Sequence, residues 1–211
     1  ALPISPYEIT VVHSSMKFTA FIIAKAPLIL IFLADYSKWY KYYEVNGVRE
    51  FQKDRGETFA GPSAGSFVLA VQDAVIAAEN AVIAAESLGI GSCYIGDIME
   101  QKEYHKTLFN LPEYVFPVAM LTLGYYPEDY MVPLKERFAE KYVVFEERYN
   151  ELSKEDIDDM FRKRDQLFTA KNKYNAKNYA QMHYNFKVKA PFSKEMQRSV
   201  EEALKEWDKK E

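Results

Sequence analysis

Residues 84–98, AAESLGIGSCYIGDI, join the end of a helix-forming segment to a short apolar strand. Gly89 follows directly on the helical pattern, and we expect it to end the helix, because glycine tolerates the backbone conformation of a helix C-cap. Gly91 and Gly96 lie beyond that point. Since glycine lacks a Cβ, both positions favour the close approach of another group to the backbone. From the spacing alone, a helix end followed by a strand without any ligand is an equally good interpretation.

The segment before this stretch predicts one long helix. Residues 67–88 are rich in alanine and apolar on nearly all sides. Such a helix is either buried or part of a subunit interface. Further helices are predicted over residues 100–111 and 194–210, and another begins at Ser153 with a capping-box pattern.

Strands are predicted by four apolar or β-branched segments, at residues 7–12, 27–35, 93–98 and 116–125. The second is a nearly continuous apolar run, typical of a strand that is buried on both faces. A short β segment is also expected within residues 133–146. The mixture of helices and strands along the chain indicates an α/β or α+β fold rather than an all-helical one.

An aromatic segment follows the second predicted strand. Residues 36–43, YSKWYKYY, combine tyrosines, a tryptophan and lysines. They form either a lid over a substrate or packing at an interface, and the sequence supports both interpretations equally. We expect the charged stretch that continues to Glu57 to be a solvent-facing excursion.

The composition limits the class of protein. Of the 211 residues, 48% are apolar, which suits one domain or one domain with an appendage. The formal net charge of −4 argues against a general nucleic-acid or anionic-membrane partner. The longest apolar stretch, residues 21–34, is short for a membrane span and is interrupted by Lys25 and Pro27. Because Cys93 is the single cysteine, we expect a cytoplasmic protein without intramolecular disulfides.

Several linked motifs, in one order along the chain, resemble the FMN-dependent nitroreductase family. The resemblance is carried by QDAVIAAENAVIAAESLGIGSCYIGDI (72–98), NLPEYVFPVAMLTLGYYPE (110–128) and KERFAEKYVVFEERY (135–149). Upstream, the family's first strands are matched by PYEITVV (6–12) and IIAKAPLILIFLAD (22–35). The match covers about residues 6–149, and the linked series is much more specific than any one motif.

The resemblance implies an α+β fold, with a nitroreductase-like central, largely antiparallel sheet flanked by helices. It implies a homodimer with FMN at the subunit interface, and residues 67–88 are the natural interface helix. We expect Ala78 and Ala81 to lie in that contact. Residues 1–150 would form the flavin-binding domain, and residues 151–211 a helical C-terminal extension that packs on the same domain or on the partner subunit.

The resemblance also implies six cofactor-binding residues. In the family, backbone N–H groups of the loop after the alanine-rich helix meet the N5 and O4 edge of the flavin. That role carries over to Ile95, Gly96 and Asp97, with Tyr94 beside them. The family's basic pair after the G-Y-P strand contacts the FMN phosphate, and Lys135 and Arg137 occupy that place. Two residues apart on an extended segment, these side chains would share a face and make charge-assisted contacts.

The sequence departs from the family at its beginning. The R-R-S-x-R motif, whose arginines and serine hold the phosphate and ribityl chain, is absent. Of the P-S-x-x-N-x-Q-P-W element, only Pro6 and Tyr7 match, and the connection from Val12 to Leu28 is shorter than the family's helical segment. We expect the N-terminal part of the flavin-binding domain to be missing from this sequence.

The function that the resemblance implies is that of an FMN-dependent oxidoreductase. Hydride would pass from NAD(P)H through the flavin to a nitroaromatic, a quinone or a related small acceptor. The sequence offers no obvious catalytic acid or base, which suits chemistry carried by a cofactor. The alternative is a flavin-binding or structural member of the family without turnover, which the missing arginine motif favours.

No metal site is predicted from the remaining candidates. His13, His105 and His183 have no spacing to one another or to carboxylates that suggests metal ligands, so we expect surface or hydrogen-bonded histidines. Cys93 lies in the flavin-loop motif, but a lone thiol of this kind usually serves packing.

Overall fold

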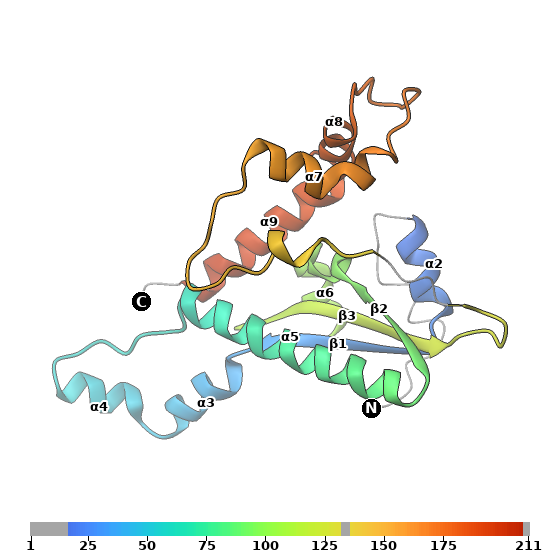
Figure 1. Ribbon diagram of the computed structural model, residues 1–211. Coiled ribbons are helices and arrows are strands. Elements are labelled where there is room, and N and C mark those ends of the chain that lie inside the picture. Colours follow the sequence, from blue (N-terminus) through green and yellow to red (C-terminus); the bar gives the residue numbers. More distant parts are fainter. Residues whose placement is uncertain (1–16, 132–135, 209–211) are drawn as a thin grey trace. The chain divides into compact units, whose positions relative to one another are not determined.

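The computed structural model describes residues 17–131 and 136–208 (Figure 1). Residues 7–12, predicted as a strand, lie outside the described residues, as do Pro6 and Lys135. Contacts divide the chain into two compact units: residues up to Pro127 together with those from Lys194 onward, and Glu128–Ser193. The predicted division at residue 150 stays a prediction.

The first unit is built from a small sheet and the helices around it. Its elements, in chain order, are α2 (Lys17–Lys25), β1 (Leu28–Asp35), α3 (Ser37–Val45), α4 (Val48–Asp54), α5 (Ala64–Ser87), β2 (Ile90–Ile95), the 3₁₀ turn η1 (Gly96–Met99), α6 (Lys102–Leu108), β3 (Val115–Tyr125) and α9 (Pro191–Trp207), which belongs to this unit from Lys194 onward.

The sheet has the strand order β1-β3-β2, and both pairings are antiparallel. β3 lies in the middle, and its residues from Val115 to Leu123 are all buried. Leu28 pairs with Leu123 at one end of β1, and Ile95 pairs with Met120 at the end of β2. The α+β fold with a central antiparallel sheet is therefore confirmed, as are the strands predicted near 27–35 and 116–125. The strand predicted over 93–98 begins and ends three residues earlier.

A register shift in the pairing of β3 with β1 changes which β3 side chains face α5. Phe32 pairs with Ala119 and Leu33 with Pro117, so Val118 has no partner on β1. In an uninterrupted strand, side chains alternate between faces with a period of two. The extra residue allows two stretches of β3 to face α5, namely Phe116 and Val118 in one apolar cluster and Leu121 and Leu123 in another.

Helix α5 covers one face of the sheet (Figure 1). Ser63 caps its N-terminus, and the Ser63 hydroxyl accepts a hydrogen bond from the Ser66 backbone in a capping box. The helix ends before Gly89, as predicted, and this glycine has a φ of +71°. Alanines dominate its buried side, so the helix approaches the strands closely. The buried residues are Phe67, Ala70, Ala74, Ala78 and Ala85.

The predicted interface positions on this helix are partly wrong. Ala78 is completely buried inside its own chain, and Ala81 packs against the cluster around Leu121 and Leu123. Both side chains face the sheet, because they lie on the same helical stripe as Ala74 and Ala85. A subunit contact through α5 has to use its other side.

That other side of α5 exposes large apolar side chains. Leu69, Ile76 and Ile83 are each about 60% exposed (63%, 61% and 59%), with Val68 and Val75 beside them. The spacing of seven residues aligns them in one stripe along the helix. By length and composition alone α5 could cross a membrane, but its alanine face packs on the sheet of its own chain.

On the opposite face of the sheet, four fully buried side chains form a separate cluster. Ile23 comes from α2, Ile95 from β2, Ile98 from η1 and Met120 from β3. This cluster fixes the end of β2 and the turn that follows it, because two of its four members belong to that short segment.

The aromatic segment at residues 36–43 is part of helix α3, and a second helix, α4, makes up most of the charged excursion. Tyr36 packs against Trp207 and Tyr40 against Tyr114, with ring centroids 6.1 Å and 4.9 Å apart. Trp39 and Tyr42 are more than half exposed. The segment therefore supplies part of the chain's own core, and only its outer residues remain available for another role.

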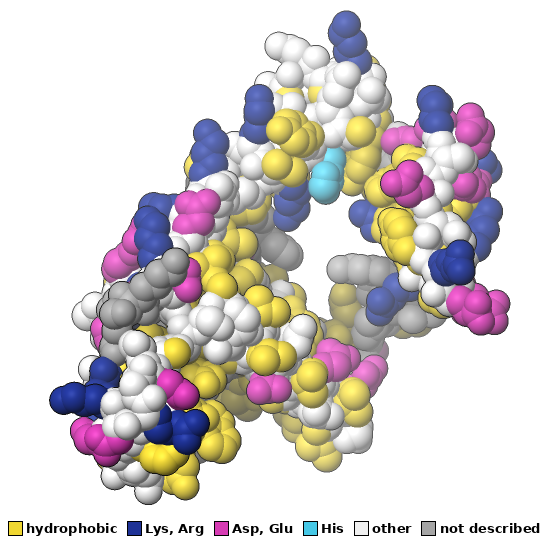
Figure 2. Space-filling view, turned by 90° about the vertical axis from the view of Figure 1, so that its left-hand side faces the viewer, with side chains coloured by type: hydrophobic (Ala, Val, Ile, Leu, Met, Phe, Trp, Pro, Cys, Tyr) yellow, Lys and Arg dark blue, Asp and Glu magenta, His cyan; other side chains and the backbone are white. Residues whose placement is uncertain are grey.

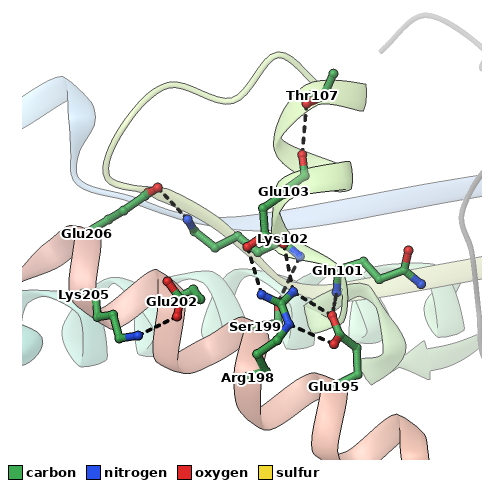
Figure 3. Close-up of polar contacts among 10 residues, drawn as sticks. All are labelled: Gln101, Lys102, Glu103, Thr107, Glu195, Arg198, Ser199, Glu202, Lys205 and Glu206. Atoms are coloured by element: carbon green, nitrogen blue, oxygen red, sulfur yellow. Dashed lines mark hydrogen bonds and ion pairs between the residues drawn. The ribbon is translucent and has the colours of Figure 1, made fainter.

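Helix α9 is held against α6 by a mixture of buried and exposed polar contacts (Figure 3). The backbone N–H of Lys102 donates to the buried Ser199 hydroxyl at 3.0 Å. The Lys102 side chain is only 8% exposed, and its ammonium group is paired with Glu206, which Lys106 also contacts at 3.2 Å. Burial alone would raise the pKa of Glu206, but the two lysines outweigh it and hold that pKa below its usual value.

A second set of charged side chains between α6 and α9 is more exposed to solvent. The Arg198 guanidinium lies between Glu103 and Glu195 and donates to both carboxylates (Figure 3). Its hydrogen bonds lower the pKa of Glu103 to about 2. Because these side chains are open to solvent, their ion pairs stabilise the fold less than the buried pair does.

Replacing Glu206 with alanine tests the buried pair. The change leaves the Lys102 ammonium group buried without a carboxylate, so we expect a loss of about 3 kcal/mol in the free energy of unfolding. Urea denaturation measures it. Glu202→Ala is the matched control on the same helix, because its partner Lys205 is exposed, and it should cost less than about 1 kcal/mol. Equal losses for both variants would contradict this account of how α9 is held.

His105 departs from the expectation of a surface or hydrogen-bonded histidine. Its side chain is completely buried in α6, and neither ring nitrogen has a hydrogen-bond partner among the described residues. Its ring packs beside Tyr104 and stacks on Phe109, 6.1 Å between centroids. Burial lowers the pKa of His105, and the nearby backbone carbonyls of Glu100 and Ile98 oppose that shift only in part. The neutral imidazole is the form that the fold accepts.

This burial makes stability depend on pH. Below about pH 6.5 the unfolded chain binds a proton at His105 that the folded chain does not, so the free energy of unfolding falls as the pH falls. In His105→Phe, urea denaturation between about pH 7.5 and pH 5 should show a smaller fall than in the original chain. His183→Phe, which changes an exposed histidine, should keep the original slope. A His105→Phe protein with an unchanged slope would show that this ring does not carry the effect.

The second unit contains the 3₁₀ turn η2 (Glu140–Tyr142), α7 (Lys154–Asp165), α8 (Tyr179–His183) and the π-helical turn η3 (Tyr184–Val188). The helix predicted from Ser153 is confirmed, and Ser153 and Asp156 form its capping box. The β segment predicted within residues 133–146 is wrong for the described part, residues 136–146, which contain η2 and no strand. Valines 143 and 144 are exposed there and find no neighbouring strand to pair with.

Candidate functional site

The turn from β2 into η1 holds four of the six predicted site residues. Tyr94 and Ile95 end the strand, and Gly96 and Asp97 begin the turn. Ile95 is buried in the cluster with Ile98 and Met120, and this packing fixes the backbone at the start of the turn. Gly96 is exposed and Asp97 partly so. A buried anchor directly before an exposed backbone is an arrangement that can present main-chain groups to a ligand in a fixed position.

Gly91 and Gly96, the two glycines that the helix end does not explain, have different surroundings in the structure. A Cβ on Gly91 would lie 2.5 Å from the Tyr126 ring, so a larger residue there would have to displace that side chain. A Cβ on Gly96 would meet only the Met99 methyl group at 3.8 Å, an ordinary contact. The close neighbour expected at Gly91 is thus a tyrosine of the same chain, whereas the backbone at Gly96 faces open space.

Tyr94 lies on the same side of the sheet as α5. Its hydroxyl donates to the Glu79 carboxylate of that helix at 3.3 Å, and its side chain is 44% exposed. Burial, followed by the negative charge of Glu79, raises the pKa of Tyr94, so the phenol stays protonated at neutral pH. The residue offers an aromatic face and a hydroxyl that already has an acceptor.

Cys93 precedes this turn, and the expectation that its thiol serves packing is wrong. The side chain is exposed, with only a weak contact of 3.7 Å from its sulfur to the carbonyl oxygen of Tyr94. Cys93 and Ile95 are two residues apart and point to the same face of the sheet, but β2 is an edge strand, and of the two only Ile95 is buried.

The predicted phosphate residues lie in another part of the chain. Arg137 belongs to the second unit, where it is exposed and lines a cavity of about 670 Å³. It makes no hydrogen bond or ion pair with any described residue. Lys135 is outside the described residues, so its predicted role stays a prediction.

The cavity around Arg137 combines charged and apolar side chains, and three of its four basic side chains come from α7. Sequence reasoning did not single out Arg164, which lines this cavity and stacks on the Phe138 ring at 4.5 Å. The signal was weak, because α7 has charges all along its length and nothing in the sequence distinguishes one arginine from its neighbours.

A second cavity, of about 860 Å³, lies beside α3 and α4 in the first unit. Charged side chains of both signs and apolar ones adjoin on the lower part of the face in Figure 2, where these helices point toward the viewer. The cationic groups in this cavity already have partners. Lys38 is paired with Asp35, and Arg49 donates to the Tyr40 hydroxyl and stacks on Phe59.

Comparison with known proteins defines the class to which this fold belongs. The family model of the Nitroreductase family matches residues 3–125, more than half of the chain. The chain belongs to the nitroreductase family.

Individual relatives agree with this assignment. A Cr(VI) reductase from Pseudomonas sp. (strain G-1) is 38% identical over 72 residues, 34% of this chain, and the matched segment spans 30% of that reductase. The structure of B. megaterium NfrA2 is similar with a TM-score of 0.73 and 27% identity, covering 98% of this chain and 79% of NfrA2. The NADPH:FMN oxidoreductase from Vibrio harveyi, solved in complex with NAD+, has a TM-score of 0.65 and 21% identity over 94% of this chain and 74% of its own.

Proposed function

We propose that the protein is an FMN-dependent oxidoreductase that takes electrons from NAD(P)H and passes them to a small acceptor such as a nitroaromatic or a quinone. Family membership supports the oxidoreductase class, and the name of the Pseudomonas relative agrees with it. The Vibrio harveyi enzyme is an NADPH:FMN oxidoreductase by name, but its likeness at 21% identity concerns the fold alone. The FMN assignment therefore depends on the residues of this chain.

The observation that carries the proposal is the open backbone at Gly96. The motif SCYIGDI resembles the family's flavin loop, and in this chain the space beside Gly96 is free of other side chains apart from the Met99 methyl group at 3.8 Å. A planar ring can approach main-chain groups closely only where no Cβ intervenes. The residues present thus fit the flavin that the family implies.

When bound, FMN would supply the hydride and electron chemistry of the reaction. The contribution of the chain is to bind and orient. Main-chain N–H groups of Ile95, Gly96 and Asp97 would donate toward the N5 and O4 edge of the flavin, and the buried Ile95 would keep them in place. Tyr94 would flank the site as a neutral phenol, because Glu79 holds its hydroxyl proton. Lys135 and Arg137 would bind the phosphate.

We propose FMN titration followed by NAD(P)H reduction as the test, with Gly96→Val as the variant. The valine side chain has room in the apoprotein, so the free energy of unfolding should change by less than about 1 kcal/mol. FMN affinity should fall by about tenfold or more, because the branched side chain occupies the approach to the backbone. Flavin fluorescence measures binding, and anaerobic bleaching of flavin absorbance by NADPH or NADH measures turnover.

The outcomes of this test separate the alternatives. A chain that binds no FMN would contradict the family interpretation of the site. FMN binding without bleaching by either nicotinamide cofactor would favour the flavin-binding member without turnover. A Gly96→Val protein with unchanged FMN affinity would place the flavin away from this turn.

We also propose that the protein is a homodimer and that the exposed stripe of α5 lies in the contact. The stripe contains Leu69, Ile76 and Ile83, spaced seven residues apart along the helix. A second copy of the chain would remove this apolar surface from water. Burial of such side chains stabilises association by roughly 25 cal/mol per Å² of apolar surface, before the entropic cost of binding.

Ile76→Arg tests this contact, since it puts a charge into the centre of the stripe. Light scattering should report a monomer, because the arginine would be desolvated without a partner. Ala77→Arg is the matched control: Ala77 is also exposed, but consecutive helix residues are rotated by about 100°, which places it off the stripe. A dimer of unchanged stability in Ile76→Arg would place the interface on another surface.

A further inference from the structure

The last two residues of β2 lie on opposite faces of the sheet, directly before the turn at Gly96. Ile95 pairs with Met120, and both side chains are buried in the cluster on the face away from α5. Tyr94 pairs with Leu121, which belongs to the cluster that packs against α5. Since paired residues of neighbouring strands point to the same face, the Tyr94 side chain lies on the α5 face.

The two faces hold this strand end by different means. On one face, Ile95 is buried and is held by apolar packing. On the other, α5 and β2 lie side by side (Figure 1), and the Tyr94 hydroxyl donates to the Glu79 carboxylate of α5 at 3.3 Å. Because the Tyr94 side chain is 44% exposed, burial holds it only in part, and its orientation depends on this acceptor.

Glu79 has few other interactions. Its carboxylate forms no ion pair within residues 17–131 and 136–208, and Tyr94 is the hydrogen-bond donor that it meets there. Glu79 lies three residues after Ile76 and four before Ile83, beside the exposed apolar stripe of α5. In these apolar surroundings, the contact with β2 is the specific interaction of this charge.

We propose that Glu79 is a positioning residue for the flavin-binding turn. Its carboxylate fixes Tyr94 on one face of β2 while the core fixes Ile95 on the other, so the chain leaves the sheet at Gly96 in one orientation. Main-chain donors that are held in place before the ligand arrives lose less conformational freedom on binding, which increases affinity. That this turn receives a flavin rests on the proposed function, whereas the effect of Glu79 on the turn concerns the flavin-free chain as well.

FMN titration of Glu79→Ala, Glu79→Gln and Tyr94→Phe in the full 211-residue chain tests the proposal. Glu79→Ala and Tyr94→Phe should each weaken FMN binding about threefold to tenfold, the range of one solvent-exposed hydrogen bond. The double variant should lose no more than either single variant, because both changes remove the same interaction. Glu79→Gln should retain most of the affinity, since its amide oxygen can still accept from the Tyr94 hydroxyl.

Glu86→Ala is the matched control. Glu86 is exposed on the same side of α5, seven residues after Glu79, but no hydrogen bond joins its side chain to another described residue. Its replacement removes the same charge from the helix and should leave FMN affinity unchanged. A loss equal to that of Glu79→Ala would contradict the proposal, because the charge of the helix and not the hydrogen bond would then be responsible.

A second measurement needs no flavin. In the flavin-free chain, NMR order parameters of the Gly96 and Asp97 amides should fall in Glu79→Ala and Tyr94→Phe, and should stay unchanged in Glu79→Gln and Glu86→Ala. The amides of β3 should keep their order parameters in all variants, which checks that the fold is intact. This measurement remains decisive if the chain binds no FMN, an outcome that would defeat the proposed function alone.

The proposal is overturned if Glu79→Ala leaves the order parameters of the turn unchanged. It is also overturned if the order parameters fall while FMN affinity stays that of the original chain, or if Glu79→Gln loses as much affinity as Glu79→Ala. In the first case the hydrogen bond would have no influence on the backbone at Gly96. In the other two it would not be what prepares the turn for FMN.

Discussion

The burial of β3 on both faces is the constraint on which the rest of the first unit depends. Each of the three apolar clusters contains residues of this strand: Phe116 and Val118, Met120, and Leu121 with Leu123. β1 and β2 pair with its two edges, and α5 covers one face. Because β3 is hydrogen-bonded on both edges, the positions of β1 and β2 are set by their pairing register with β3 rather than by the loops that connect the strands.

The position of the proposed flavin-binding turn follows from this register. Ile95 lies opposite Met120 and closes the pairing of β2, so the chain leaves the sheet at Gly96. The bulge at Val118 decides which β3 side chains face α5 and which face Ile95 and Ile98. A core element therefore determines where an exposed backbone appears, and this connects stability in the sheet to the geometry of the site.

Local patterns predicted much of this arrangement. The apolar run of β1, the long α5 helix and the helix stop at Gly89 follow from periodicity and backbone preference, which act within a few residues. The resemblance to the family added the prediction that the sheet is largely antiparallel. In contrast, the close approach of the Tyr126 ring to Gly91 is a contact 35 residues away along the chain that no local pattern reveals.

Other features were missed for the same reason. His105 lies in an amphipathic helix typical of a surface, yet its ring is buried beside Tyr104 and Phe109, and its nitrogens have no hydrogen-bond partner among the described residues. The face of α5 that meets the sheet could not be identified from a helix apolar on nearly all sides, so Ala78 was assigned to the wrong surface. Arg164 is one of several charged residues on α7, and only the ring of Phe138 and the pairing of its neighbours distinguish it.

Hydrogen exchange at individual amides, with and without FMN, tests the central claim most directly, namely that the backbone after β2 receives the flavin. Without FMN, Gly96 is exposed and Asp97 is partly exposed. Bound FMN would cover this backbone, and the amides of Gly96 and Asp97 should therefore exchange more slowly. The amides of β3, already buried in the sheet, should change little. If FMN binds and slows exchange elsewhere while Gly96 and Asp97 keep their rates, the flavin does not lie at this turn.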